Sequence, residues 1–178
     1  KSLGAECNFI SVIGNDQNSR IIRNEMDNIQ LNHHFIEDIT RPTTFKKRYM
    51  VENQKIFRVS KLNDEKLSYD IEHKIIKKLH ELAPKSDGII VSDFVYGVIT
   101  KNIINKISEL SKKFNLKLFG DLQCSSQIGN ITQFANYELL CPNEREARLA
   151  LQDKESGLEV LSQKLFSKTK CNRLIMKL

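Results

Sequence analysis

The chain has 178 residues, which is enough for one globular domain, or a large part of one, with a sizeable core. Hydrophobic residues make up 40% of the chain and charged residues 28%, which is ordinary for a globular protein. The sequence contains no apolar run long enough to cross a bilayer and no signal-peptide pattern, which argues against a membrane protein and predicts a cytoplasmic location. The net charge of +6 fits an anionic partner such as a phosphorylated small molecule, whereas lysines spread over polar helix faces without interleaved aromatics argue against nucleic acid.

The first third of the chain predicts a strand–helix–strand unit followed by a hairpin. Residues 7–13 predict a strand, and a helix follows with Asn18 or Ser19 as its N-terminal cap. A short strand is expected at 33–36. Residues 43–51 and 56–59 are β-prone and are separated by a polar turn at 52–55. Because no helix lies between these two strands, they are expected to pair antiparallel, outside any parallel sheet.

The second half of the chain alternates helix and strand in a regular way. A helix from residue 68 is expected to stop before Pro84, and the β-branched run at 88–91 predicts a strand buried on both faces. Further helices are expected after Thr100 and at 144–151 and 157–166, and further strands at 116–119, 137–141 and 173–178. This alternation predicts an α/β fold with a mostly parallel central sheet.

Polar side chains follow three consecutive predicted strands: Ser92-Asp93, then Asp121, then Asn143 with Glu146. In a parallel sheet the carboxyl ends of the strands share one edge, so these groups are expected to converge there. Carboxylates and an amide at such an edge suit Mg²⁺ with its water shell or the hydroxyls of a sugar. The alternative is that each residue only closes a turn or caps a helix, as Asn143 could.

Other reactive side chains give weaker signals. Four scattered cysteines without paired spacing predict free buried thiols, and no histidine partner is evident that would make Cys124 a nucleophile. Arg41 and Arg48 have the alternative interpretation of exposed hairpin charges.

Several of these segments together resemble the PfkB (ribokinase-like) carbohydrate kinases, most closely the heptose 7-phosphate kinase module of bacterial ADP-heptose synthesis. The resemblance runs from about Gly4 to the end and rests on Arg41-Pro-Thr-Thr-Phe-Lys-Lys-Arg48, Asn53-Gln54 with Arg58, Ser92-Asp93-Phe94-x-x-Gly97, Asp121, and Pro142-Asn143-x-x-Glu146. It implies a ribokinase-like α/β fold, helices on both sides of the sheet, and a small inserted β lid near residues 34–60.

The resemblance also implies an ATP- and Mg²⁺-dependent transfer of a phosphoryl group to a sugar, and a homodimer formed through the lid. The implied sugar contacts are Arg48, Asn53 and Asp93. The implied nucleotide and phosphate contacts are Asp121, Asn143 and Glu146, with Asn143 and Glu146 ordering Mg²⁺ through water.

The chain also departs from the family pattern. Tyr96 and Gln123 stand where the heptose kinases carry lysine, so two cations are missing. The GAGD segment with its catalytic base is expected after Leu178, and the GGA-x-N sugar-binding start before Lys1, so the chain resembles the middle portion of a single kinase domain with no catalytic residue of its own. The leading interpretation is a kinase for a phosphorylated heptose; the alternative is a degenerate, non-catalytic protein that binds a sugar or a nucleotide.

Overall fold

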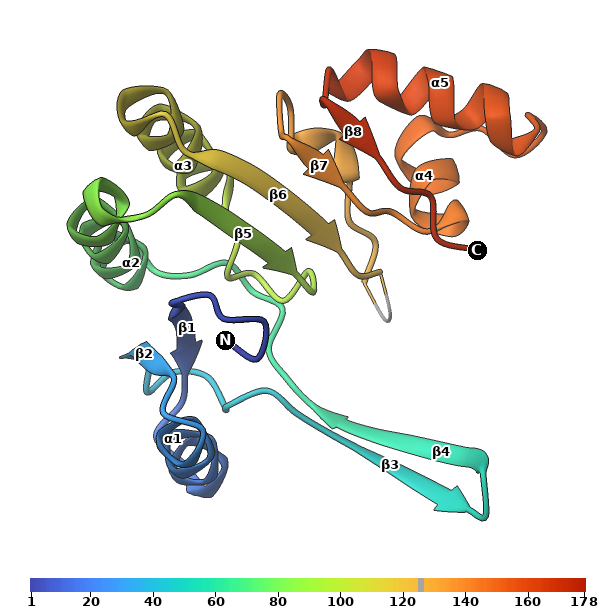
Figure 1. Cartoon of the computed structure of the whole chain (residues 1–178). Coiled ribbons are helices and arrows are strands. Elements are labelled where there is room, and N and C mark those ends of the chain that lie inside the picture. The colour runs from blue at the N-terminus through green and yellow to red at the C-terminus, as the bar shows by residue number, and fades with distance from the viewer. Residues whose placement is uncertain (125–126) are drawn as a thin grey trace. The chain divides into compact units, whose positions relative to one another are not determined.

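The computed structural model describes residues 1–124 and 127–178, and it divides into two compact units, 1–78 and 79–178 (Figure 1). Each unit is described by itself below. The predicted α/β fold class is confirmed, because parallel strands alternate with helices in both units and an antiparallel hairpin is inserted in the first.

The first unit begins with a strand–helix–strand element. Strand β1 (Asn8–Ile13) pairs in parallel with β2 (Asn32–Glu37), and α1 (Gln17–Asn28) connects them. The predicted cap of α1 at Asn18 or Ser19 is wrong. Asp16 is the N-cap and accepts a hydrogen bond from the Ser19 backbone, while the Ser19 hydroxyl accepts one from Asp16. Ser19 is therefore the third residue of a capping box.

A long hairpin follows, made of β3 (Phe45–Val51) and β4 (Gln54–Lys61). Its turn is Glu52-Asn53, shorter than predicted, with Glu52 at φ 50°, and a bulge interrupts the pairing between Tyr49 and Met50. The antiparallel pairing is as predicted. β2 pairs with β1 in parallel and does not extend the hairpin, although the predicted lid range began at residue 34.

Arg41, interpreted as a possible exposed hairpin charge, is in fact buried. Its side chain is 9% exposed, its Nε lies 3.1 Å from Asp38 Oδ2, and its Nη2 donates to the Glu65 carbonyl at 2.9 Å. A buried guanidinium needs such partners to offset the loss of water. Arg41 therefore joins the segment before the hairpin to the segment after it, whereas Arg48 is exposed on β3.

The second unit is built on a four-stranded parallel sheet in the order β5-β6-β7-β8. These strands are β5 (Gly88–Asp93), β6 (Lys117–Leu122), β7 (Leu139–Leu140) and β8 (Arg173–Leu174). Helix α2 (Tyr69–Leu82) crosses the boundary between the two units and continues as η1 (Ala83–Lys85). The remaining helices are α3 (Lys101–Phe114), η2 (Ile131–Gln133), α4 (Glu144–Leu151) and α5 (Leu158–Thr169).

Strand β5 is not buried on both faces as predicted. Val91 is 3% exposed, whereas Ile90 is 78% exposed, so the strand has one covered and one open face. Successive side chains of a strand point to opposite faces, so Val91 lies on the covered face and Ile90 on the open one. β5 and β6 are each longer than predicted, because ladder pairing continues through Ser92 with Asp121 and Asp93 with Leu122.

The core of the second unit is aliphatic and closely packed. Its fully buried side chains include Leu110, Leu122, Leu140, Leu161 and Leu165. All four cysteines are free, as predicted, but only Cys171 is buried and the other three are partly exposed. Among the described residues, the helices are all too short or too polar to cross a lipid bilayer.

Candidate active site

The carboxyl ends of β5, β6 and β7 share one edge of the sheet, but the two aspartates there lie on opposite faces. Asp93 is paired with Leu122, and Ser92 is paired with Asp121. Because paired residues of neighbouring strands share a face and successive residues alternate, Asp93 lies on the covered face and Asp121 on the open one. The solvent exposure of these residues agrees with this assignment of faces, because Asp93 and Leu122 are buried, whereas Ser92 is exposed and Asp121 is partly exposed.

Asp93 is a buried carboxylate held at both oxygens. It is 6% exposed; Oδ1 accepts from the Val95 backbone at 2.7 Å, and Oδ2 accepts from Gln133 Nε2 at 3.1 Å. Burial raises the pKa of this carboxyl, and the hydrogen bonds from Val95 and Gln133 offset part of that rise. The carboxylate is therefore fixed in orientation, as a group that contacts one ligand hydroxyl must be.

The loop after β5 is strained at one residue. Val95 has φ 61°, which is unfavourable for a β-branched side chain, and Gly97 has φ 74°. The Val95 amide donates the hydrogen bond that Asp93 Oδ1 accepts. On its other side Val95 meets Gly129, where an added Cβ atom would lie 2.6 Å from Val95 Cγ2. The loop at Gly129 thus packs directly on the Asp93 loop. Backbone strain that surrounding contacts maintain is common at functional sites.

Tyr96, one of the two positions where a lysine was expected, is a core residue. It is 6% exposed and stacks on Phe94 with ring centroids 6.3 Å apart. Gln123, the other position, is exposed, and its Nε2 donates to Asp121 Oδ2 at 3.2 Å. The aromatic ring at 96 gives a packing reason for the absence of lysine there.

Asp121 on the open face forms an ion pair with a residue that the sequence did not indicate. Lys177 Nζ lies 2.7 Å from Asp121 Oδ1. Lys177 is brought there because the chain after β8 runs beside the start of α4, where it forms a parallel bridge with Asn143. Since the two residues are 56 positions apart, no local sequence signal could have paired them.

Asn143 and Glu146 form a capping box at the start of α4. Asn143 Oδ1 accepts from the Glu146 backbone at 2.8 Å, and Glu146 Oε2 accepts from the Asn143 backbone at 2.8 Å. The other Glu146 oxygen accepts from the Cys124 backbone at 3.1 Å, and the side chain is only 2% exposed. Asn143 is thus the helix cap considered from the sequence, and Glu146 joins α4 to the loop after β6.

The Cys124 thiol shows no sign of activation. Burial raises the pKa of its thiol, and the charges of Glu146 and Asp93 raise it further, against lowering by the Gly129 amide and Arg145. Gly129 N donates to its Sγ at 3.2 Å. This agrees with an inert thiol, and it shows that Asp93 and Glu146 both lie near Cys124.

The donor set permits only an indirect magnesium ion. No cluster of three His, Cys, Asp or Glu side chains suited to a metal occurs in the part of the chain that the structure describes. Each Glu146 oxygen accepts one backbone hydrogen bond and keeps a lone pair for a water molecule. Since Mg²⁺ retains several waters in most protein sites, contact through water fits these residues and direct ligation does not.

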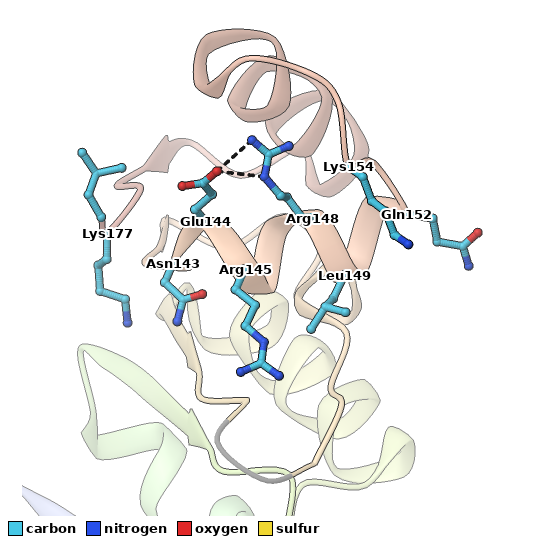
Figure 2. Close-up of a pocket in the computed structure, with 9 residues that line it drawn as sticks. Asn143, Glu144, Arg145, Arg148, Leu149, Gln152, Lys154 and Lys177 are labelled. Carbon is cyan, nitrogen blue, oxygen red and sulfur yellow. Dashed lines mark hydrogen bonds and ion pairs between the residues drawn. The ribbon is translucent and has the colours of Figure 1, made fainter. Parts of the chain in front are cut away.

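A pocket of about 770 Å³ lies along α4, on the side of Asn143 and Lys177 (Figure 2). Four cations and one carboxylate line it together with neutral residues: Asn143, Glu144, Arg145, Arg148, Leu149, Gln152, Lys154, Lys177 and Leu178. Figure 2 shows Arg148 joined to Glu144, with Arg145 pointing away from that pair. Of these residues, only Asn143 was predicted as a site residue.

The two predicted sugar contacts of the first unit lie on the hairpin. Arg48 is on β3 opposite Arg58, and Asn53 is in the two-residue turn, where it is exposed. Like Asp93, Asp121, Asn143 and Glu146, they keep their predicted roles as proposals.

Comparison with solved structures identifies the class of fold as that of the ribokinase-like kinases. The chain is similar to ribokinase from Giardia lamblia, with a TM-score of 0.72 and 14% identity, covering 95% of this chain and 55% of that one. It is also similar to phosphofructokinase-2 from Escherichia coli, with a TM-score of 0.71 and 12% identity, covering 97% of this chain and 55% of that one. At these identities the likeness establishes the fold alone.

The chain belongs to the pfkB family of carbohydrate kinases, whose sequence pattern it matches over residues 1–178. Among curated proteins it is similar to the bifunctional protein HldE of Helicobacter hepaticus, 27% identical over 177 residues, and to that of Helicobacter acinonychis, 31% identical over 157 residues. These alignments cover 96% and 88% of this chain but only 35% and 33% of the relatives, so the chain spans about a third of their length. The predicted family is confirmed.

Proposed function

We propose that this chain is part of an ATP-dependent sugar kinase whose substrate is a phosphorylated heptose. The observation that carries the proposal is the match to the pfkB carbohydrate kinases along the whole chain. The similarity to proteins named HldE, together with the motif series from Arg41 to Glu146, supports a heptose phosphate as the sugar.

In this proposal each predicted residue has a limited task. Asp93, held by Val95 and Gln133, accepts a hydrogen bond from a sugar hydroxyl and fixes the orientation of the sugar. Arg48 and Asn53 add sugar contacts from the hairpin. Asp121 and Asn143 contact the nucleotide side, and Glu146 holds the loop after β6 and a water of the ion. A bound Mg²⁺ supplies neutralisation of phosphate charge. The base that deprotonates the hydroxyl is expected outside this chain.

Two accompanying predictions belong to the same proposal. The enzyme acts in the cytoplasm, where ATP and sugar phosphates are available. It forms a homodimer through the hairpin, whose apolar side chains are exposed.

The second candidate is a degenerate relative that binds a sugar or nucleotide without transferring phosphate. It is favoured by the absence of lysine at Tyr96 and Gln123, and by the structural use of both Glu146 oxygens. Phosphoryl transfer depends on preorganised positive charge, so the loss of two cations would weaken it.

The two candidates are separated by ADP formation from ATP with a panel of sugar phosphates, measured on the full-length protein. Turnover that requires both Mg²⁺ and a heptose phosphate supports the kinase. Saturable sugar or nucleotide binding without ADP formation supports the degenerate protein and contradicts the kinase.

A further inference from the structure

Within the first unit, the hairpin of β3 and β4 is held at its base. None of the residues 45–61 is buried, and the two strands pair only with each other. The segment just before the hairpin is different, because the polar residues Asp38, Arg41 and Thr43 are all buried. A two-stranded ribbon has little of its own to fix its direction, so the contacts of these buried residues decide how the hairpin is held.

Thr43 joins the segment before β3 to the turn between β1 and α1. Its Oγ1 accepts a hydrogen bond from the Gly14 amide at 2.9 Å, and its own amide donates to Asp16 Oδ2 at 2.9 Å. The two backbones touch there, because a Cβ atom on Gly14 would collide with the Arg41 carbonyl oxygen and lie 2.8 Å from the Thr43 nitrogen. Only glycine allows this close approach, so the turn and the segment before β3 form one packed base.

Asp16 serves α1 and the hairpin base with separate oxygens. Oδ1 accepts from the Ser19 amide as the N-cap of α1, and Oδ2 accepts from the Thr43 amide. Burial raises the pKa of this carboxyl, but hydrogen bonds from Thr43 and Ser19 and the charge of Lys61 outweigh it and hold the pKa below its usual value. Lys61 is the last residue of β4, so the Asp16 carboxylate interacts with both ends of the hairpin.

Arg41 connects the segments on the two sides of the hairpin. Its Nε donates to Asp38 Oδ2 at 3.1 Å, and its Nη2 donates to the Glu65 carbonyl, beyond β4, at 2.9 Å. The Asp38 amide in turn donates to the carbonyl of Ile13, the last residue of β1, at 2.9 Å. Both ends of the hairpin are therefore tied to β1 and to the start of α1.

We propose that Thr43 and Asp16 are positioning residues, which set the direction of the hairpin and thereby the place of its proposed sugar contacts. These contacts are Arg48 and Asn53, so the inference rests on the proposed function. Only Thr44 lies between Thr43 and the start of β3. At about 3.4 Å per residue Asn53 is roughly 30 Å along the strand from this base, so a rotation of about 10° there moves it by about 5 Å. An error of about 1 Å already weakens a positioned contact severely.

The first test compares Thr43→Val with Thr43→Ser in the full-length protein by amide hydrogen exchange. Valine has the shape of threonine but cannot accept from the buried Gly14 amide, whereas serine keeps the hydroxyl. Thr43→Val is expected to speed exchange in residues 45–61 about tenfold and in α1 less than about twofold, because only the hairpin is released. Thr43→Ser should exchange like the wild type, as should the matched control Thr44→Val, which changes the exposed neighbour in the same way.

Asp16→Asn tests the same assignment from the other side of the contact. Asparagine caps a helix as well as aspartate does, so Oδ1 still accepts from the Ser19 amide. Its NH₂ group, however, meets the Thr43 amide with donor against donor. The variant is therefore expected to release the hairpin and to keep α1 protected. Equal loss of protection in α1 and in the hairpin would show a role in folding alone and contradict the proposal.

The functional readout is the KM for the sugar phosphate. Thr43→Val and Asp16→Asn are expected to raise it about tenfold, while kcat at saturating sugar and the KM for ATP change less than about twofold, because contacts to the bound sugar are weakened uniformly. Thr43→Ser and Thr44→Val should keep the KM of the wild type. A purely structural defect lowers the active fraction, and therefore kcat, and leaves the KM for the sugar unchanged.

The outcomes separate this proposal from the proposed function. Exchange and sugar KM equal to the wild type in Thr43→Val and Asp16→Asn overturn the positioning role, and so does faster exchange with an unchanged KM; turnover by the wild type then still supports the kinase. If the wild type forms no ADP, the kinase fails, and the Kd for heptose 7-phosphate from calorimetric titration replaces the KM. A roughly tenfold weaker Kd in both variants then supports the positioning role, and an unchanged Kd, or no binding to the wild type, overturns it.

Discussion

At the scale of single residues, Glu146 has a structural task beside the functional one that is proposed for it. Its two oxygens accept from the backbone amides of Asn143 and Cys124, and it is buried. The motif Pro-Asn-x-x-Glu predicted contact with phosphate and Mg²⁺ through water, and the capping interpretation of Asn143 was open from the sequence. The contact to Cys124 could not be foreseen, because it joins residues 22 positions apart.

Glu146→Gln is therefore expected to destabilise the fold as well as to slow magnesium-dependent turnover. The amide places an NH₂ group against one of two backbone donors, and leaving a buried donor unsatisfied costs about 2 kcal/mol. Urea unfolding of the full-length protein measures this loss. The control is Glu144→Gln, where the partly exposed i,i+4 ion pair with Arg148 contributes about 0.5 kcal/mol. Equal stability of the wild type and Glu146→Gln would contradict the assigned hydrogen bonds.

Asp93 should make stability depend on pH in a defined direction. Its folded pKa is raised by burial above the ordinary 3.8, so the native state binds this proton more tightly than the unfolded chain does. The stability that Asp93 contributes is thus greatest at low pH and is lost as the pH rises through the folded pKa. Relative to Asp93→Asn, the wild type should lose unfolding free energy as the pH increases above 3.8.

Urea unfolding of both proteins over a series of pH values gives this difference. A difference that stays constant with pH, or that grows in favour of the wild type, would be inconsistent with a raised pKa for Asp93.

At the scale of elements, the sequence predicted the kind and order of helices and strands better than their bounds. The helical spacing of apolar residues identified the helices, and short β-prone apolar runs identified the parallel strands. It did not show that β5 and β6 continue through Asp93 and Asp121, because polar residues look like strand ends when their ladder partners are unknown. This difference in strand length matters for the chemistry. Because Asp93 and Asp121 both lie inside strands, the alternation of side chains puts them on opposite faces of the sheet, and these two carboxylates do not form one cluster.

The hairpin of β3 and β4 is the element whose stability most needs a partner. A two-stranded sheet is marginal by itself in water, and this one exposes the apolar residues Met50, Val51, Ile56, Phe57 and Val59. Tyr49 and Phe57 stack on one face with centroids 4.3 Å apart. The exposed apolar surface supports the proposed dimer, because such patches mark interaction sites.

The double variant Phe57→Lys and Val59→Lys is expected to weaken self-association of the full-length protein by about 100-fold or more, since it places two like charges on one hairpin face. Sedimentation velocity over a concentration series measures the change. Lys55→Gln, in the same hairpin but without apolar surface, serves as the control and should leave association unchanged. A wild type that remains monomeric at high concentration, or a double variant that still dimerises like the wild type, would refute dimerisation through this face.

At the scale of the whole molecule, family membership and fold are established, and the chemistry is proposed. The chain spans about a third of the HldE relatives and little more than half of the similar solved structures. The residues of this chain form a buried carboxylate at Asp93, which is held by two hydrogen bonds, and a capping box that anchors the start of α4. In the proposed kinase these residues bind and orient the substrates, and the base for phosphoryl transfer is expected elsewhere in the protein.

The central claim is tested most directly by following ³¹P resonances while the full-length protein is incubated with ATP, Mg²⁺ and heptose 7-phosphate. The account predicts that the γ-phosphate signal of ATP is lost as a second phosphate ester appears on the heptose. Asp93→Asn should slow this transfer at limiting sugar by about 100-fold, because a positioned hydrogen bond to the reacting sugar is lost. ATP that stays intact with every sugar phosphate offered to a correctly folded, nucleotide-binding protein would contradict the assignment as a kinase.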